Sequence, residues 1–217
     1  MCTVKKKRFS LKEREKNIIM KNGFKKFIKF VVRGCIYIGC KIYYRAEIKG
    51  LENIPKDGAL IFAGNHRSYL DPPLIVATAK RDMRFIAKEE LKNNKFLKFL
   101  IWVFNAILVK RDEKDVGPVK ESLKTLKEGN CIALFPEGTR NGMEKGEKAK
   151  DGVAFFALRS GAKVVPCGIK GGEKGKRKVT ITYGKPLDYS NYKGIKDKEV
   201  LEKVTEEIMK NIIELAK

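Results

Sequence analysis

Short apolar runs alternate with segments of helical periodicity along most of the chain, and this alternation limits the fold more than any other feature. The helical patterns follow Pro72 and Pro73 and recur at 88–105, 115–128, 151–161 and 197–217. The apolar runs, each typical of a buried strand, are ALIFA at 59–63, RFIA at 84–87, AILVK at 106–110, CIALF at 131–135, KVVPCGI at 163–169 and KVTITYG at 178–184. Strands that alternate with helices predict an α/β fold, in which helices flank a central, mixed and largely parallel sheet.

The chain has 217 residues, enough for one domain with a full hydrophobic core and a short appendage. Ahead of the alternating pattern, apolar residues spaced by three and four predict a helix from Phe24 to Tyr44, and we expect the first twenty residues to be poorly ordered. We therefore divide the chain into an N-terminal helical segment, residues 1–46, and one globular domain, residues 47–217.

The formal net charge of +22 is extreme for this length and predicts a polyanionic partner, which is a nucleic acid, an anionic membrane or a phosphorylated substrate. Residues 1–45 carry fourteen Lys or Arg against two acids, Glu13 and Glu15, so the charge is concentrated at one end. A basic end of this kind favours docking to a surface.

Lys25, Lys29 and Arg33 form a basic stripe beside the apolar positions of the predicted N-terminal helix. A basic amphipathic helix with aromatic residues is typical of a segment that lies in a membrane interface. The alternative is a helix packed on its own domain with solvated lysines. The local charge favours the membrane, and no apolar stretch here approaches the ~20 residues of a spanning helix.

The five cysteines are odd in number and irregularly spaced, and none forms a Cys-x-x-Cys pair. We interpret them as reduced thiols of a cytosolic protein, with Cys131 and Cys167 buried in strands. One histidine and scattered cysteines give no zinc pattern, so neither a metal nor a bound cofactor is expected.

His66 is the only histidine and follows a predicted strand within NHRSYLD, residues 65–71. Histidine is the usual general base near neutral pH. Asp71 meets it only if His66 lies in a turn and Asp71 caps the helix that Pro72 begins, because on one continuous helix the two would point about 140° apart. The competing interpretation is a turn histidine beside an ordinary helix cap.

A second loop, FPEGTRNG at 135–142, also follows a predicted strand directly. Gly138 and Gly142 allow close backbone approach, Thr139 offers a hydroxyl, and Arg140 offers a forked cation for phosphate. Taken alone, a solvated turn explains this loop as well.

NHRSYLD and FPEGTR, about seventy residues apart, together resemble the two strongest motifs of the glycerolipid acyltransferase family, closest to the bacterial 1-acyl-sn-glycerol-3-phosphate acyltransferases. AILVKRD at 106–112 is similar to the intermediate block of that family, with Arg111 as its arginine, and KVVPCGI is similar to the fourth block, centred on Pro166. Asn105, Lys110 and Cys167 depart from the usual pattern of these blocks. The likeness extends from about residue 47 to 187.

The resemblance implies an O-acyltransferase that moves a fatty acyl group from a thioester to the sn-2 hydroxyl of 1-acyl-glycerol 3-phosphate, giving phosphatidic acid. His66 would be the base and Asp71 its orienting acid, without an acyl-enzyme. Substrate would be bound by Lys88, Arg111, Glu137, Gly138, Thr139 and Arg140. The oxyanion donors would be backbone N–H groups near the first motif.

The partners implied are an anionic membrane, lysophosphatidic acid, and acyl-CoA or acyl carrier protein, with the protein peripheral or monotopic on the cytoplasmic face of the cell membrane. Glycerol 3-phosphate or another lysolipid is an alternative acceptor. Nucleic-acid binding is less well supported, because no RNP-like motif, zinc finger or helix-turn-helix is found. The apolar residues of 96–104, including Trp102, are expected to line an acyl-chain groove or to be ordinary core.

Overall fold

A computed structural model describes residues 11–110, 116–142, 146–172 and 177–217. Its centre is a seven-stranded sheet with the strand order β1-β7-β6-β2-β5-β3-β4. Neighbouring strands are parallel except β6 and β7, which pair antiparallel. The strands are β1 (Glu47–Lys49), β2 (Leu60–Gly64), β3 (Met83–Lys88), β4 (Ile107–Val109), β5 (Cys131–Leu134), β6 (Lys163–Gly171) and β7 (Val179–Tyr183).

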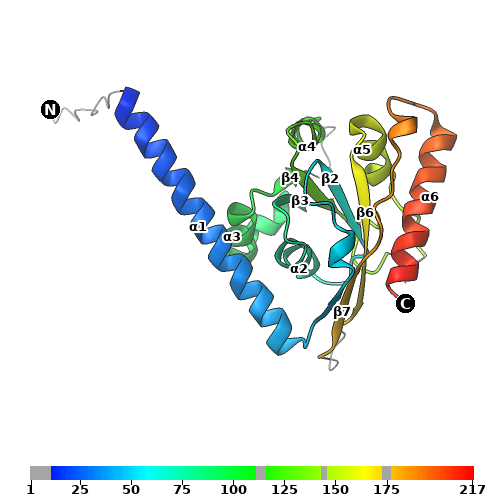
Figure 1. The fold of residues 1–217 in the computed structure, drawn as a ribbon, viewed down its shortest axis with the longest axis horizontal. Coiled ribbons are helices and arrows are strands. Elements are labelled where there is room, and N and C mark those ends of the chain that lie inside the picture. The colour runs from blue at the N-terminus through cyan, green and yellow to red at the C-terminus, as the bar shows by residue number, and fades with distance from the viewer. Residues whose placement is uncertain (1–10, 111–115, 143–145, 173–176) are drawn as a thin grey trace.

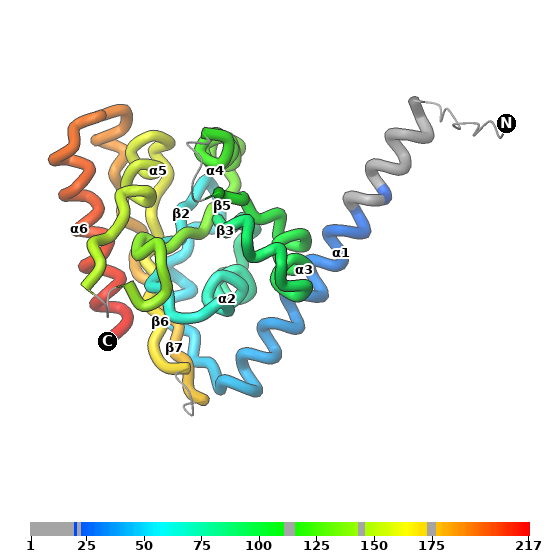
Figure 2. The backbone as a smooth tube through the Cα atoms, turned by 180° about the vertical axis from the view of Figure 1, so that it is seen from behind, coloured from blue at the N-terminus to red at the C-terminus, as the bar shows by residue number. Residues whose placement is uncertain are grey.

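Six α-helices cover the two faces of this sheet (Figures 1 and 2). Their bounds are α1 (Leu11–Tyr43), α2 (Asp71–Thr78), α3 (Lys95–Val103), α4 (Gly117–Lys127), α5 (Gly152–Ser160) and α6 (Lys198–Leu215). One hydrophobic cluster joins the sheet to α1, α2 and α3, and a second joins it to α4, α5 and α6. The fold is thus a three-layer α/β sandwich with a core on each side of the sheet.

The predicted fold class is confirmed, and each of the six apolar runs overlaps a strand. Strand β1 and the short 3₁₀ turns Leu51–Asn53 and Ser190–Tyr192 were not predicted. Three residues are too few for a periodic pattern, and β1 pairs with β7, which lies more than 130 residues later in the chain. Its strand conformation therefore depends on a tertiary contact.

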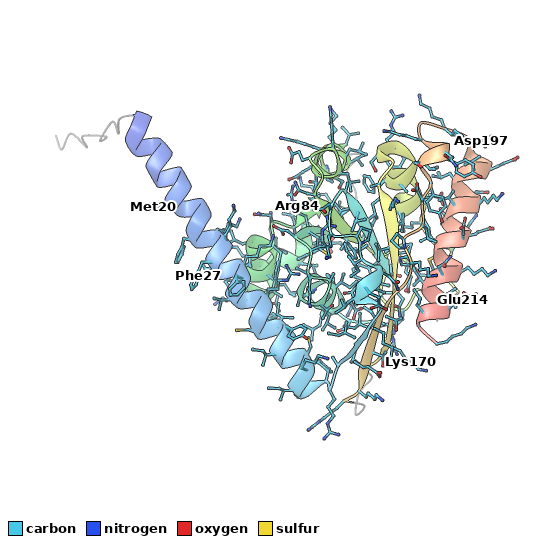
Figure 3. All side chains as sticks on the ribbon, viewed as in Figure 1. Met20, Phe27, Arg84, Lys170, Asp197 and Glu214 are labelled. Carbon is cyan, nitrogen blue, oxygen red and sulfur yellow. The ribbon has the colours of Figure 1, made fainter. Side chains whose placement is uncertain are left out.

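Helix α1 begins at Leu11, so the prediction that regular structure starts near Phe24 and that residues 11–20 are poorly ordered was wrong. Residues 1–10 lie outside the described part. The N-terminal half of α1, where Met20 and Phe27 lie, projects away from the sheet (Figure 3). No helix among the described residues combines the length and the apolar character needed to cross a membrane.

The apolar residues of α1 divide into two sets. Ile28, Val32 and Ile36 pack against the core. A second set is more than 40% exposed; within it Phe30 and Tyr43 lie apart, and at ~100° per residue the other six fall within about 60° of one another around the helix axis. This apolar stripe of α1 consists of Met20, Phe24, Phe27, Val31, Ile38 and Ile42.

The basic stripe predicted on α1 faces the domain. Lys29 forms an ion pair with Asp82, and the Lys25 ammonium lies over the Trp102 ring. Arg33 is half-buried, and this desolvation lowers the pKa of its guanidinium, although Asp82 opposes the shift. These cations therefore do not stand beside the exposed apolar stripe, and they help to attach α1 to the domain.

Candidate active site

The candidate site lies where β2, β3 and β5 end. These three strands are neighbours and run parallel, so the segments that follow them start at one edge of the sheet. The loop after β2 contains His66, the loop after β5 contains Glu137 to Arg140, and Lys88 ends β3. The carboxyl edge of a parallel sheet is the usual place for a ligand in α/β proteins.

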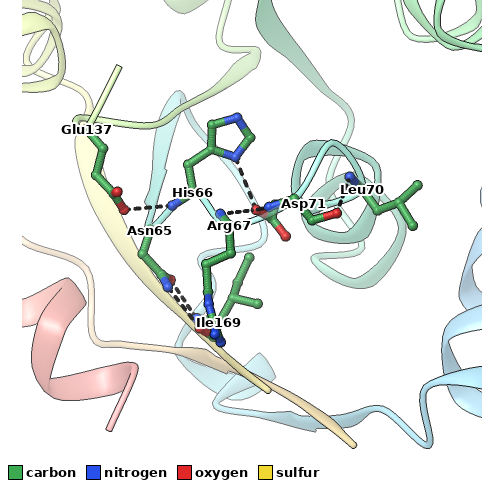
Figure 4. Close-up of polar contacts among 8 residues, drawn as sticks. Asn65, His66, Arg67, Leu70, Asp71, Glu137 and Ile169 are labelled. Carbon is green, nitrogen blue, oxygen red and sulfur yellow. Dashed lines mark hydrogen bonds and ion pairs between the residues drawn. The ribbon is translucent and has the colours of Figure 1, made fainter. Parts of the chain in front are cut away.

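His66 and Asp71 meet as predicted. Asp71 Oδ2 lies 3.1 Å from His66 Nδ1 and also accepts the backbone N–H groups of Arg67 and Ser68, both at 2.6 Å (Figure 4). The Asp71 side chain is 3% exposed and that of His66 is 19% exposed. The carboxylate is therefore fixed by three donors, and the imidazole attached to it reaches solvent.

Asp71 is not the helix cap that the sequence predicted. Leu70 occupies the cap position, and Asp71 is the first residue of α2. A capping side chain accepts an N–H from two or three residues further along the chain. Asp71 accepts N–H groups that precede it, so its side chain folds back over the loop and holds that loop around His66.

The His66 main chain and ring are also held by the second loop. Its N–H donates to Glu137 Oε1 at 2.8 Å, and its carbonyl accepts the N–H of Asn141 at 2.6 Å. The imidazole stacks on Phe135, with ring centroids 4.4 Å apart and planes 24° apart. Glu137 is buried, and its contact with the His66 N–H braces the histidine loop.

Asn65 anchors the histidine loop to the sheet. Its amide donates to the carbonyl of Ile169 at 2.8 Å and accepts the N–H of the same residue at 2.7 Å, so it imitates a strand pairing with β6 (Figure 4). Arg67 reaches the same strand and donates to the Gly171 carbonyl at 3.1 Å. These contacts could not be predicted from the sequence, because they join residues more than one hundred positions apart.

Three residues of the FPEGTR loop have defined environments. Gly138 has φ +66°, a left-handed conformation that favours glycine, and the end of the Lys150 side chain passes over it. The Thr139 hydroxyl donates to Glu147 Oε2 at 2.7 Å. The Arg140 guanidinium lies 3.8 Å from the centre of the Tyr69 ring, which places the arginine beside the histidine loop.

A cavity of about 620 Å³ opens at His66. Its lining contains the cations Lys88, Lys110, Arg140 and Lys150, the carboxylate of Glu90, and apolar side chains that include Phe85, Leu97, Leu100 and Ile101. This volume and mixture of side chains suit a lipid with a charged head group. Arg111, a predicted substrate-binding residue, lies outside the described residues.

Lys150 was not predicted. Its side chain passes over Gly138, and it is paired with no carboxylate among the described residues. An ammonium without a counter-ion at the wall of a substrate cavity is a candidate ligand for an anion. The sequence contains many lysines, and only the packing of the loops in the structure distinguishes Lys150 from the others.

Three backbone N–H groups of the first motif, which was expected to supply oxyanion donors, already have acceptors within the protein. The N–H of His66 is donated to Glu137, and those of Arg67 and Ser68 are donated to Asp71. These three groups stabilise the loop and are not available to a substrate oxygen.

The described cysteines have no place in this chemistry. Cys131 and Cys167 are buried in strands, and burial raises the pKa of both thiols, so they remain protonated at neutral pH. Among the described residues, no group of three His, Cys, Asp or Glu side chains could hold a metal ion.

Comparisons with known proteins agree with this arrangement. The family model described as Acyltransferase matches residues 45–170. A 1-acyl-sn-glycerol-3-phosphate acyltransferase of Bacillus subtilis (strain 168) is 29% identical over 82% of this chain and 88% of that protein. A protein of the same name from Borreliella burgdorferi is 32% identical over 63% of this chain and 56% of that protein.

A solved structure is also similar, the 1-acyl-sn-glycerophosphate (LPA) acyltransferase PlsC from Thermotoga maritima. It superposes with a TM-score of 0.62 at 28% identity, over 90% of this chain and 88% of that one. The likeness thus includes both the helical N-terminal region and the sheet.

Proposed function

Given that this chain belongs to the acyltransferase family, we propose that it transfers a fatty acyl group from a thioester to the sn-2 hydroxyl of 1-acyl-glycerol 3-phosphate, which gives phosphatidic acid. The names of the similar proteins from Bacillus and Thermotoga support this acceptor. The observation that carries the proposal is the His66–Asp71 pair beside a cavity that is lined by both cationic and apolar side chains.

His66 acts as the general base. With Nδ1 directed to Asp71, the other ring nitrogen, Nε2, points away from the carboxylate (Figure 4). Nε2 takes the proton from the acceptor hydroxyl as that oxygen attacks the thioester carbonyl carbon. The tetrahedral intermediate then breaks its C–S bond, and the departing sulfur takes the proton back from His66, so the products are an ester and a free thiol.

Asp71 serves this step in two ways. Its contact with Nδ1 keeps the proton of the neutral ring on Nδ1 and leaves Nε2 free to accept, and its negative charge stabilises the imidazolium that forms. Glu137 holds the main chain of the same histidine, so the ring has few alternative positions. Phe135 supports one face of the ring.

The phosphate of the acceptor binds to the cations of the cavity lining. Arg140 and Lys88 line the cavity at His66, and Lys150 adds a further cation beside Gly138. Arg111 belongs to the same set by its resemblance to the intermediate block of the family. An arginine fork and several ammonium groups suit a dianionic phosphate.

The N-terminal segment, residues 1–46, docks the catalytic domain, residues 47–217, to the cytoplasmic face of the cell membrane. The support is the apolar stripe of α1, whose exposed Phe24 and Phe27 face away from the core. A single helix face of this kind enters the interfacial region without crossing the bilayer. The net charge of +22 attracts anionic lipid.

An acceptor panel tests the proposed reaction. Purified full-length protein is given acyl-CoA or acyl carrier protein as donor, with 1-acyl-glycerol 3-phosphate, glycerol 3-phosphate, lysophosphatidylcholine or monoacylglycerol as acceptor. We expect acylation of the first at the highest kcat/KM, with one free thiol released for each ester formed. A preference for glycerol 3-phosphate or for an acceptor without phosphate would overturn the proposed substrate while leaving the family unchanged.

A further inference from the structure

The outer face of α3 is aromatic and basic. Its exposed side chains, which we call the α3 outer face, are Lys95, Phe96, Lys98, Phe99 and Trp102. Phe96 is 57% exposed, Trp102 is 47% exposed, and the helix contains no acidic residue. An exposed cluster of large aromatic side chains on so short a helix is typical of a surface that binds a partner.

The inner face of the same helix belongs to the catalytic cavity. Leu97, Leu100 and Ile101 line the 620 Å³ space that opens at His66. Helix α3 is therefore a wall that separates the active-site cavity from the exterior by the thickness of one helix, about 10 Å. The expectation that residues 96–104 form a groove or a core was correct for these inner residues and wrong for the three exposed aromatic ones.

The α3 outer face also adjoins α1. The Lys25 ammonium lies 5.1 Å from the centre of the Trp102 ring and donates to the Asn105 side chain. Phe24, the residue before Lys25, belongs to the exposed apolar stripe of α1. Figures 1 and 2, which view the molecule from opposite sides, both show α3 beside the middle of α1, so the α3 outer face lies next to the helix that carries the exposed apolar stripe.

We propose that α3 is a second membrane-contacting element, and that its outer face enters the interfacial region of an anionic bilayer next to α1. This inference rests on the membrane docking proposed above. It adds that the bilayer lies directly against the wall of the catalytic cavity, so the acyl chain of the acceptor reaches His66 by a short path past α3. The enzyme would then act on lipids of the membrane because its cavity lies next to the bilayer.

The chemistry of the α3 outer face favours a bilayer over a second copy of the chain. Tryptophan and phenylalanine with interleaved lysines are the side chains that settle at the level of lipid head groups. A second copy would bring lysines against lysines on chains that each carry a net charge of +22. An anionic lipid surface instead supplies the opposite charge.

Trp102 is the only tryptophan in the chain, so the native protein carries its own reporter on this face. The full chain is mixed with vesicles of phosphatidylcholine, alone or with phosphatidylglycerol, and co-sedimentation and tryptophan fluorescence are measured together. With the anionic vesicles we expect binding, a blue shift, and at least about twofold quenching by lipids brominated near the head-group end of the acyl chain.

Three results would each overturn the inference, and they are distinguishable from one another. Co-sedimentation without a blue shift or quenching would show that α1 docks alone and that α3 stays in water. A failure to bind the anionic vesicles at all would instead contradict the proposed membrane docking itself. A concentration-dependent blue shift without vesicles would identify a second copy as the partner.

A pair of substitutions supplies the functional arm of the test. The double variant Phe96→Ser, Phe99→Ser should weaken vesicle partitioning by about tenfold or more, since both rings are exposed in solution and would be buried on binding. Phe155→Ser is the matched control, because Phe155 is also exposed but lies on α5, on the other face of the sheet. Equal binding by all three proteins would contradict the role of α3, and their thermal melts confirm folding.

Discussion

Replacing Asp71 with asparagine separates the shape of the site from its charge. Asparagine has nearly the same shape, and its Oδ1 can occupy the position of Asp71 Oδ2, where the N–H groups of Arg67 and Ser68 arrive at 2.6 Å. His66 Nδ1 would keep an acceptor but lose the negative charge 3.1 Å away. We therefore expect Asp71→Asn to fold and to be a poor catalyst.

The expected loss of kcat/KM and the expected change in the free energy of unfolding can both be estimated from these contacts. At an effective dielectric constant of about 20, a unit charge 3.1 Å from an imidazolium contributes at most about 5 kcal/mol, and the transition state realises part of it. We expect kcat/KM to fall about 10²- to 10⁴-fold. The two N–H hydrogen bonds change from charge-assisted to neutral, which lowers the free energy of unfolding by about 2 kcal/mol.

The assay follows phosphatidic acid and free thiol for wild type and Asp71→Asn, with urea unfolding of both. Asp71→Ala is the contrasting variant, because it leaves two part-buried N–H groups without their carboxylate acceptor and should lower the free energy of unfolding further, by about 2–4 kcal/mol. If Asp71→Asn is folded and its kcat/KM stays within about tenfold of wild type, the charge of Asp71 is not part of the mechanism.

Other consequences of the site and the fold are equally direct. Lys150→Gln should raise KM for 1-acyl-glycerol 3-phosphate about tenfold or more with little change in kcat. Lys148→Gln is the control, because Lys148 lies on the same segment but does not line the cavity, and it should change neither KM nor kcat. Steady-state kinetics of the two variants measures these effects. Asn65→Ala leaves the N–H and carbonyl of Ile169 unpaired and should lower the free energy of unfolding by about 2–5 kcal/mol, which urea unfolding measures. Burial raises the pKa of Cys40 from 9.0 to about 11, so between these values the unfolded chain loses a proton that the folded chain keeps. The free energy of unfolding should therefore fall as pH rises through this window, and Cys40→Ala should reduce the slope.

Local patterns predicted the elements of this fold because each buried strand is an unbroken apolar run. CIALF contains β5 and KVVPCGI forms the first seven residues of β6, and neither run carries a charge except at an end. The same runs did not fix the strand order, since the pairing of β2 with both β5 and β6 depends on contacts about seventy and one hundred residues apart. The three-residue strand β1 was not predicted, because it too depends on pairing with a strand distant in the sequence.

The sequence predicted the contact between His66 and Asp71 but not the contacts of the residues around this pair. The spacing of His66 and Asp71, followed by two prolines, left a turn histidine beside an ordinary helix cap as an alternative, and the resemblance to the family motifs led us to expect their contact. The bracing of His66 by Glu137 and the approach of Lys150 to Gly138 arise from the packing of separate loops. Periodicity on α1 likewise identified an amphipathic helix, but only the structure shows that its lysines face the domain.

The most direct test of the central claim is a single-turnover comparison of wild type with His66→Ala, using 1-acyl-glycerol 3-phosphate in vesicles and a labelled acyl thioester. Vesicle co-sedimentation and thermal unfolding establish that both proteins bind and fold alike. The account predicts that phosphatidic acid forms at least about a hundredfold more slowly in the variant, because the general base is lost. Formation at a rate within a few-fold of wild type would contradict the assignment of His66 as the base.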